Sequence, residues 1–148
     1  MAASEQIVCP ACSALNRVPA DRPAAEARCG KCHGKLFTAH PIEVDEATFE
    51  RHIRSDSIPV LLDVWAPWCG PCRTMGPQFE RAAATLEPRV RLLKLNADQA
   101  PDVSARLGVR GIPAMFLFQN GKPIAQSAGA MNADAIVRWT HDNLSLKN

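Results

Sequence analysis

The sequence predicts an α/β protein, with a mixed central sheet flanked by helices on both faces, preceded by a small metal-binding segment. From residue 44 onward, apolar strand-like runs alternate with helical patterns and close in a hairpin, as in sheets that helices cover on both faces. Before residue 41, four cysteines form two Cys-x-x-Cys pairs in a stretch without sustained helical or strand periodicity. We therefore expect two domains, a metal-binding one in residues 1–40 and an α/β one in residues 41–148.

The composition is that of a globular chain. At 148 residues, with 47% apolar and 22% charged residues, there is room for one ordinary domain and a small appendage. The first twelve residues, MAASEQIVCPAC, lack a basic start followed by an apolar run of signal-peptide length, and no stretch approaches the length that crosses a bilayer. A formal net charge of +2 gives no electrostatic case for nucleic acid. We therefore expect a cytoplasmic protein without a membrane or nucleic-acid partner.

The N-terminal segment has few features of a regular domain. Residues 1 to about 34 carry prolines and glycines between the cysteine pairs, and a connector follows at residues 35–42. So short a segment buries too little surface to fold unaided. We therefore expect something other than a hydrophobic core to hold it together.

The rest of the chain has clear periodicity. Apolar residues at helical spacing predict helices, and apolar runs bounded by turn residues predict strands. The predicted helices cover residues 44–55, 76–87, 101–108 and 132–144. The predicted strands cover residues 59–66, 89–97, 114–119 and 122–129. Gly108 closes the third helix, and Asn120 with Gly121 predicts a two-residue hairpin turn between the last two strands.

All six cysteines occur in pairs separated by two residues, which favours metal ligation or dithiol chemistry over structural disulfides. The first two pairs, Cys9 with Cys12 and Cys29 with Cys32, fit a double-knuckle zinc site. Each pair supplies two corners of a tetrahedron from a tight turn. One zinc ion bound to such a peptide supplies about 10–16 kcal/mol of apparent folding energy, which makes up for the missing core.

The run CGKCH at residues 29–33 admits other interpretations. A haem attached there requires export and an apolar segment around the macrocycle, and it leaves Cys9 and Cys12 unexplained. The same four sulfurs suit a rubredoxin-like iron site, His33 is an alternative fourth ligand in place of Cys32, and metal-free dithiols stay open as well. Zinc is the prediction because the segment needs an ion to order it.

The third pair lies in the motif WCGPC at residues 68–72, directly after a predicted strand. Two sulfurs are too few for a closed metal site, so this pair predicts redox exchange. At the start of a helix, unpaired backbone N–H groups and the positive end of the helix dipole lower the pKa of the Cys69 thiol. Cys72, one turn further along, reaches the mixed disulfide that Cys69 forms with a substrate.

The motif WCGPC makes residues 42–148 resemble thioredoxin. Further matching segments are KLNADQ at residues 94–99, RGIPAMFLF at residues 110–118, and the single residues Asp63 and Gly129. With the N-terminal knuckles added, the chain is similar to the bacterial zinc-containing type, thioredoxin 2. The resemblance implies the thioredoxin fold for the α/β domain and a zinc-ribbon-like segment before it.

The resemblance also implies roles for individual residues, with Cys69, Cys72, Asp63 and Lys94 as the catalytic set. Asp63, a carboxylate in an apolar strand, would take the proton of Cys72, and Lys94 would lie near Asp63 and tune it. From the residues alone, a satisfied or edge-exposed carboxylate at Asp63 and a solvated surface lysine at Lys94 stay open.

A docking surface for substrate is implied opposite the dithiol. Pro113 resembles the family's cis-proline, which leaves the backbone of Ile112 free to pair with an extended substrate segment. The residues of this flat, mainly apolar surface are Trp68, Gly70, Pro71, Ile112, Pro113 and Gly129.

The predicted function is the reduction of protein disulfides, with Cys69 as the nucleophile and Cys72 as the resolving thiol. The resemblance implies protein disulfide substrates, an NADPH-dependent thioredoxin reductase as electron donor, a monomer and no bound organic cofactor. Two alternatives stay open, a metal-stapled docking scaffold or holdase whose redox activity is secondary, and an oxidant or isomerase.

Overall fold

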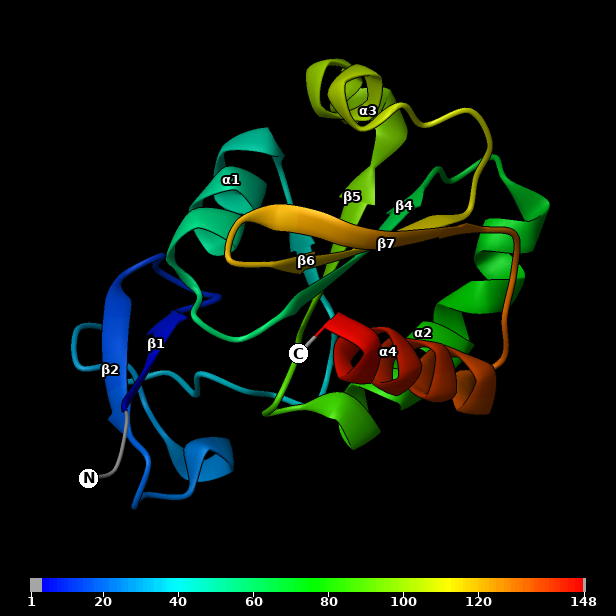
Figure 1. Ribbon diagram of the computed structural model, residues 1–148. Coiled ribbons are helices and arrows are strands. Elements are labelled where there is room, and N and C mark those ends of the chain that lie inside the picture. The colour runs from blue at the N-terminus through cyan, green and yellow to red at the C-terminus, as the bar shows by residue number, and fades with distance from the viewer. Residues whose placement is uncertain (1–3, 148) are drawn as a thin grey trace.

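The computed structural model describes residues 4–147, and its centre is a five-stranded mixed sheet with the strand order β3-β5-β4-β6-β7 (Figure 1). The strands are β3 (Ile42–Val44), β4 (Val60–Trp65), β5 (Arg91–Asn96), β6 (Ala114–Gln119) and β7 (Lys122–Ala128). The first three run parallel, whereas β6 and β7 are antiparallel to their neighbours. This arrangement confirms the predicted mixed sheet.

Two apolar cores lie on the two faces of this sheet. The helices are α1 (Glu46–Ser55), α2 (Gly70–Leu86), α3 (Pro101–Leu107) and α4 (Ala133–Lys147). On one face, α1 and α3 pack on alternate strand residues such as Leu62 and Val64. On the other, α2 and α4 pack on the residues between them, such as Leu61 and Met115. Each core therefore uses the two-residue alternation of the strands. In the described part of the chain, no helix is both long enough and apolar enough to span a membrane.

The four predicted helices and the four predicted strands are confirmed, but their boundaries differ. Helix α1 begins two residues late, at Glu46, because Asp45 caps it: Thr48 N–H donates to Asp45 Oδ1 at 2.8 Å, and Asp45 N–H donates to Thr48 Oγ1 at 3.0 Å. Helix α2 begins at Gly70, six residues before its periodic segment, with Pro71 in its first turn, where no N–H is needed.

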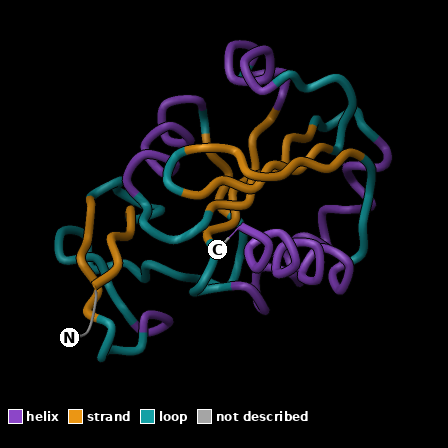
Figure 2. The backbone as a smooth tube through the Cα atoms, viewed as in Figure 1, coloured by secondary structure: helices purple, strands orange, loops and turns teal. Residues whose placement is uncertain are grey.

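Three strands went unpredicted because each is short. Strand β3 has three residues, of which the first is the last residue of the predicted connector and the third is the first residue of the predicted helix. Strands β1 (Ser4–Val8) and β2 (Leu15–Pro19) form an antiparallel hairpin in the segment that shows no sustained periodicity. Figure 2 shows that the remainder of this segment is mostly loop. We call residues 4–37 the ribbon.

The ribbon packs tightly on the α/β domain, with β1 beside α1 (Figure 1). Its interior includes Ile7, Leu36 and Phe37, and it is closed by Ile58, which lies between α1 and β4. This small core packs the ribbon against the domain, but it is much smaller than either core of the sheet.

A buried cluster of charged side chains fixes the ribbon to the domain through the backbone of Val8. The Val8 N–H donates to Asp56 Oδ1 at 2.7 Å, and Arg91 Nη2 donates to the Val8 carbonyl oxygen at 3.1 Å. His52 Nδ1 lies 2.6 Å from Asp56 Oδ2, and the Arg91 guanidinium lies 4.5 Å from the centre of the Phe37 ring. Asp56, Arg91 and His52 are all buried. Both hydrogen-bonding groups of one ribbon residue are thus held by side chains of the domain.

Candidate active site and metal centre

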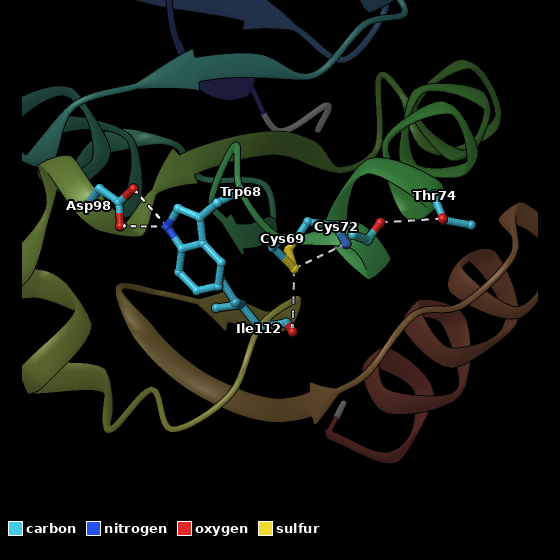
Figure 3. Close-up of a disulfide and its surroundings, with 7 residues drawn as sticks. Trp68, Cys69, Cys72, Thr74, Asp98 and Ile112 are labelled. Atoms are coloured by element: carbon cyan, nitrogen blue, oxygen red, sulfur yellow. Dashed lines mark hydrogen bonds between the residues drawn. A yellow bond between two sulfur atoms is a disulfide. The ribbon is translucent and has the colours of Figure 1, made fainter.

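The dithiol lies where β4 ends and α2 begins. Cys69 and Cys72 are joined by a disulfide, Cys69 is the N-terminal capping residue of α2, and the Cys72 N–H points at Cys69 Sγ with an N···S distance of 3.2 Å (Figure 3). Both side chains are at most 5% exposed. A sulfur at this place meets the unpaired N–H groups and the positive end of the helix, which favour a thiolate when the disulfide is reduced.

The loop before β6 faces the dithiol. The carbonyl oxygen of Ile112 lies 3.7 Å from Cys69 Sγ, and the peptide bond between Ile112 and Pro113 is cis. Gly129 N–H donates to the Pro113 carbonyl oxygen at 2.9 Å, and Gly129 has φ of 98°, a value that favours glycine. The end of β7 is thereby tied to the loop that faces the sulfurs.

A shallow hollow of about 530 Å³ lies beside Cys69. Trp68 forms one side of it and is 67% exposed, while Nε1 of its indole donates to the carboxylate oxygens of Asp98 at 3.0 and 3.2 Å (Figure 3). The lining residues include Gly70, Pro71, Arg110 and Ile112. An exposed aromatic ring held in place by a hydrogen bond is a suitable contact for an extended peptide.

Asp63 is a buried carboxylic acid at the centre of β4. It is 1% exposed, and its neighbours Leu62 and Val64 pack on α1 and α3, so Asp63 projects to the face that α2 covers. Burial raises the pKa of Asp63 to about 7, although Lys94 acts in the opposite direction. Lys94 lies directly across from Asp63 on β5, which is consistent with the predicted proximity.

The four N-terminal cysteines converge on one point. Their Sγ atoms all lie within 4.8 Å of one another, with Cys9 to Cys32 and Cys12 to Cys29 at 3.6 Å each. A tetrahedral zinc site with Zn–S bonds of about 2.3 Å places its sulfurs roughly 3.8 Å apart. The cluster therefore fits zinc, and within the described residues the group close enough to hold such an ion consists of these four cysteines, without His33.

The backbone around the cluster favours thiolates. Three N–H groups point at the sulfurs: Ala11 at Cys9, Lys31 at Cys29 and Gly34 at Cys32, at 3.3–3.4 Å. The backbone N–H of Cys32, followed by the side chain of Asn16, lowers the pKa of the Cys29 thiol to about 5. The pKa of Cys12 moves the other way, to about 11: the backbone of Ala14 lowers it, but burial and the three neighbouring thiols raise it. Because zinc binds the thiolate form, Cys29 is the ligand best prepared for a metal, and Cys12 would have to lose its proton on binding.

The two cysteine sites lie at opposite ends of the parallel strands. The ribbon contacts Arg91, the first residue of β5, whereas the dithiol follows Trp65, the last residue of β4. Six strand residues span roughly 20 Å, so neither site touches the other. Figure 1 shows the ribbon, in blue, on the side of the molecule away from the start of α2.

Several residues with structural or chemical importance were not predicted. Asp98 and Arg110 lie in the segments that carry the family resemblance, so those segments were the available signal for them. His52 and Asp56 are four residues apart, so a helix alone brings them together, but nothing in the sequence pattern pointed to Arg91, which meets Asp56 only after folding. Trp139 is partly buried and packs against the core between α2, α4 and the sheet.

Comparison with known proteins places both parts of the chain. The profile of the thioredoxin family matches residues 40–142, and the profile described as thioredoxin 2, N-terminal, matches residues 8–34. Thioredoxin C-3 of Corynebacterium nephridii is 38% identical over 138 residues, covering 93% of this chain and 94% of the relative. The chloroplastic M-type thioredoxin of Chlamydomonas reinhardtii is 35% identical over 131 residues, covering 86% and 94%. The crystal structure of chloroplastic thioredoxin z superposes with a TM-score of 0.66 at 26% identity, covering 72% of this chain and 96% of that one.

Proposed function

The chain belongs to the thioredoxin family, and we propose that Cys69 is its attacking thiol and Cys72 its resolving thiol in the reduction of protein disulfides. Membership makes the protein a thiol-disulfide oxidoreductase. The observation that carries the residue roles is the Cys69–Cys72 disulfide at the first turn of α2, with Cys69 next to the open hollow.

The first step is attack by the Cys69 thiolate on one sulfur of a substrate disulfide. The substrate S–S bond breaks, a bond forms between Cys69 and that sulfur, and the other substrate sulfur leaves as a thiolate. The N–H groups at the start of α2 stabilise the attacking anion. An extended substrate segment pairs with the backbone at Ile112, whose carbonyl oxygen lies 3.7 Å from Cys69 Sγ.

The second step is attack by Cys72 on the mixed disulfide. Cys72 gives up its proton to the Asp63 carboxylate, bonds to Cys69 Sγ and releases the second substrate thiolate, so two electrons pass from the dithiol to the substrate. A pKa of about 7 suits Asp63 to this task, since the carboxylate is available at neutral pH and binds a proton readily. The docking surface comprises Trp68, Gly70, Pro71, Ile112, Pro113 and Gly129.

Regeneration requires an external reductant that returns two electrons to the Cys69–Cys72 disulfide. A thioredoxin reductase that draws on NADPH is the partner that the family implies. We place this cycle in the cytoplasm, because four clustered thiols that serve as metal ligands suit a reducing compartment. The hollow and the dithiol are complete within one chain, which supports action as a monomer.

The proposed cofactor is one zinc ion held by Cys9, Cys12, Cys29 and Cys32, without a bound organic cofactor. Such an ion supplies a closed, redox-inert tetrahedral centre that holds the ribbon together. The proposed domains are residues 1–40, stabilised by this centre, and residues 41–148, stabilised by the two cores of the sheet.

An insulin-reduction assay with dithiothreitol tests the residue roles. A Cys69→Ser variant is expected to fall to the rate of dithiothreitol alone, because no thiolate is left to attack the substrate. A Cys72→Ser variant is expected to form a long-lived mixed disulfide through Cys69, visible by mass spectrometry. Full activity of Cys69→Ser, with zinc content and fold unchanged, would refute the proposed mechanism.

A further inference from the structure

We propose that Glu43 is a positioning residue for the exchange reaction: together with Trp65 it holds Lys94 over the Trp65 ring and out of an ion pair with Asp63, and so keeps that carboxylate able to accept the proton of Cys72. The inference rests on the proposed role of Asp63 as proton acceptor. Glu43 is exposed on the short edge strand β3, where a carboxylate would otherwise be read as an ordinary surface charge.

The strand register places three charged residues in one row. Glu43 on β3 is the partner of Lys94 on β5, and Lys94 is the partner of Asp63 on β4. Their strand neighbours, including Val44, pack on the α1 and α3 side of the sheet, so all three charged residues belong to the face that α2 covers. The row therefore runs from the exposed carboxylate, through the lysine, to the buried carboxyl.

Trp65 connects this row to the dithiol. Its indole Nε1 donates to Glu43 Oε2 at 3.0 Å, and the ammonium of Lys94 lies 4.7 Å from the centre of its ring. Its side chain also packs against the cluster that contains Cys69 and Cys72. One indole thus holds the carboxylate at its edge and the ammonium at its face, which fixes the position of the lysine.

The charges that act on Asp63 are few. Lys94 favours the ionised carboxylate and lowers the pKa of Asp63, whereas Glu43 raises that pKa, in addition to the dominant effect of burial. The partner of Asp63 on β6 is the uncharged Met115. Asp63 Oδ1 has no hydrogen-bond partner among the described residues, so burial sets most of its proton affinity and Lys94 is the charge that adjusts it.

Removing the charge of Glu43 has a predictable sign. In a Glu43→Gln variant the negative charge that opposes ionisation of Asp63 is gone, and the cross-strand carboxylate that competes with Asp63 for the attraction of Lys94 is lost. Both changes favour ionised Asp63. Glu43 lies two strand spacings from Asp63, roughly 10 Å. We therefore expect the pKa of Asp63 to fall by about half a unit in the Glu43→Gln variant.

The test is a titration of the Asp63 carboxyl carbon by NMR in the oxidised protein, where Cys69 and Cys72 do not titrate. The matched control is Glu26→Gln in the ribbon, which changes the net charge equally but does not contact the row. The proposal predicts a lower Asp63 pKa in Glu43→Gln and no change in Glu26→Gln. An unchanged Asp63 pKa in Glu43→Gln would overturn it.

A second pair of variants tests whether Glu43 acts through Lys94. In a Lys94→Gln background, Glu43→Gln is expected to shift the Asp63 pKa by less than half as much as in the wild type, and a full shift there would overturn the positioning role. Trp65→Phe keeps the aromatic face but loses the N–H, and is expected to shift the Asp63 pKa in the direction of Glu43→Gln.

The pH profile of insulin reduction separates this inference from the proposed function. If Asp63 accepts the proton, the acid limb of the profile moves to lower pH in Glu43→Gln by the same amount as the NMR titration. An Asp63→Asn variant with full activity at every pH would refute Asp63 as proton acceptor, and with it any role of Glu43 in the exchange. If the Asp63 pKa is unchanged in Glu43→Gln while Asp63→Asn is impaired, the role of Glu43 is refuted and that of Asp63 is not.

Discussion

The chain uses one cysteine spacing in two ways, and the N-terminal and C-terminal regions differ in what the backbone does after the first cysteine. After Cys9 and Cys29 the chain turns back, with Ser13 N–H and His33 N–H each donating to the cysteine carbonyl at 2.9 Å. After Cys69 it continues into the helix α2. Turns bring four sulfurs to one point, whereas a helix leaves two sulfurs at its positive end. Spacing identifies a cysteine pair, and the backbone that follows selects metal binding or electron transfer.

The two regions also differ in the hydrogen-bond partners of their buried aspartates. Beside the ribbon, Asp56 accepts a hydrogen bond from Val8 and lies close to His52 and Arg91. Beside the dithiol, Asp63 lacks a hydrogen-bond partner for Oδ1 among the described residues. A paired carboxylate fixes one arrangement of the chain, and an unpaired one keeps a high affinity for protons. The first therefore suits a structural role, and the second suits the proton-accepting role proposed for Asp63.

Loss of the metal is expected to have the largest effect, and to affect the ribbon but not the sheet. A Cys12→Ser variant is expected to lose zinc and, with it, on the order of 10 kcal/mol of apparent stabilisation of the ribbon. Hydrogen exchange in residues 9–36 should become fast, while the sheet keeps its protection because its two cores do not involve the metal. Zinc content and hydrogen exchange, both by mass spectrometry, measure this. Cys72→Ser is the control that keeps zinc and protection, and an ordered ribbon in zinc-free Cys12→Ser would contradict the prediction.

The buried cluster of Asp56, Arg91 and His52 holds the backbone of Val8, and we call it the clamp. It links the two regions, so a substitution in it tests the comparison. An Arg91→Met variant keeps an apolar side chain against Phe37 but leaves Asp56 and Glu87 without their cation. We expect it to lower the free energy of unfolding by about 3–5 kcal/mol. Urea denaturation measures the change, with the exposed Arg89→Met as a control expected to stay within about 0.5 kcal/mol. A loss below about 1 kcal/mol would show that the clamp does not stabilise the fold.

The clamp also marks the limit of what the sequence could predict. Long periodic segments and the motif WCGPC led to the helices, the four longer strands and both cysteine sites, because those signals are local. Strands β1 and β3 gave no usable period at their lengths of five and three residues. The partners in the clamp come from positions 8, 56 and 91, and Glu43 meets Trp65 and Lys94 only across strands. Such contacts depend on tertiary folding, which no local pattern encodes.

The last expected effect concerns Asp63 and has the opposite sign to that of the clamp. The folded protein holds the Asp63 proton up to a pKa of about 7, whereas the unfolded chain loses it near the ordinary value of 3.8. Between these values the native state binds more protons, so wild-type stability falls as the pH rises through this window. An Asp63→Asn variant has no carboxyl to ionise, so it avoids this fall in stability. We expect it to be more stable than the wild type by about 4 kcal/mol at pH 8, with the difference vanishing below about pH 4.

The same substitution at Asp56 is the matched control, because it changes the other buried aspartate and not the fold around Asp63. Asp56→Asn weakens the pairing with His52 and Arg91, so it is expected to destabilise the protein while Asp63→Asn stabilises it. Urea denaturation at pH 4 and pH 8 distinguishes the two. If Asp63→Asn proved no more stable than the wild type at pH 8, the raised pKa of Asp63 would be wrong. The contrast between a structural Asp56 and a proton-accepting Asp63 would then fail, because the proton-accepting role depends on that raised pKa.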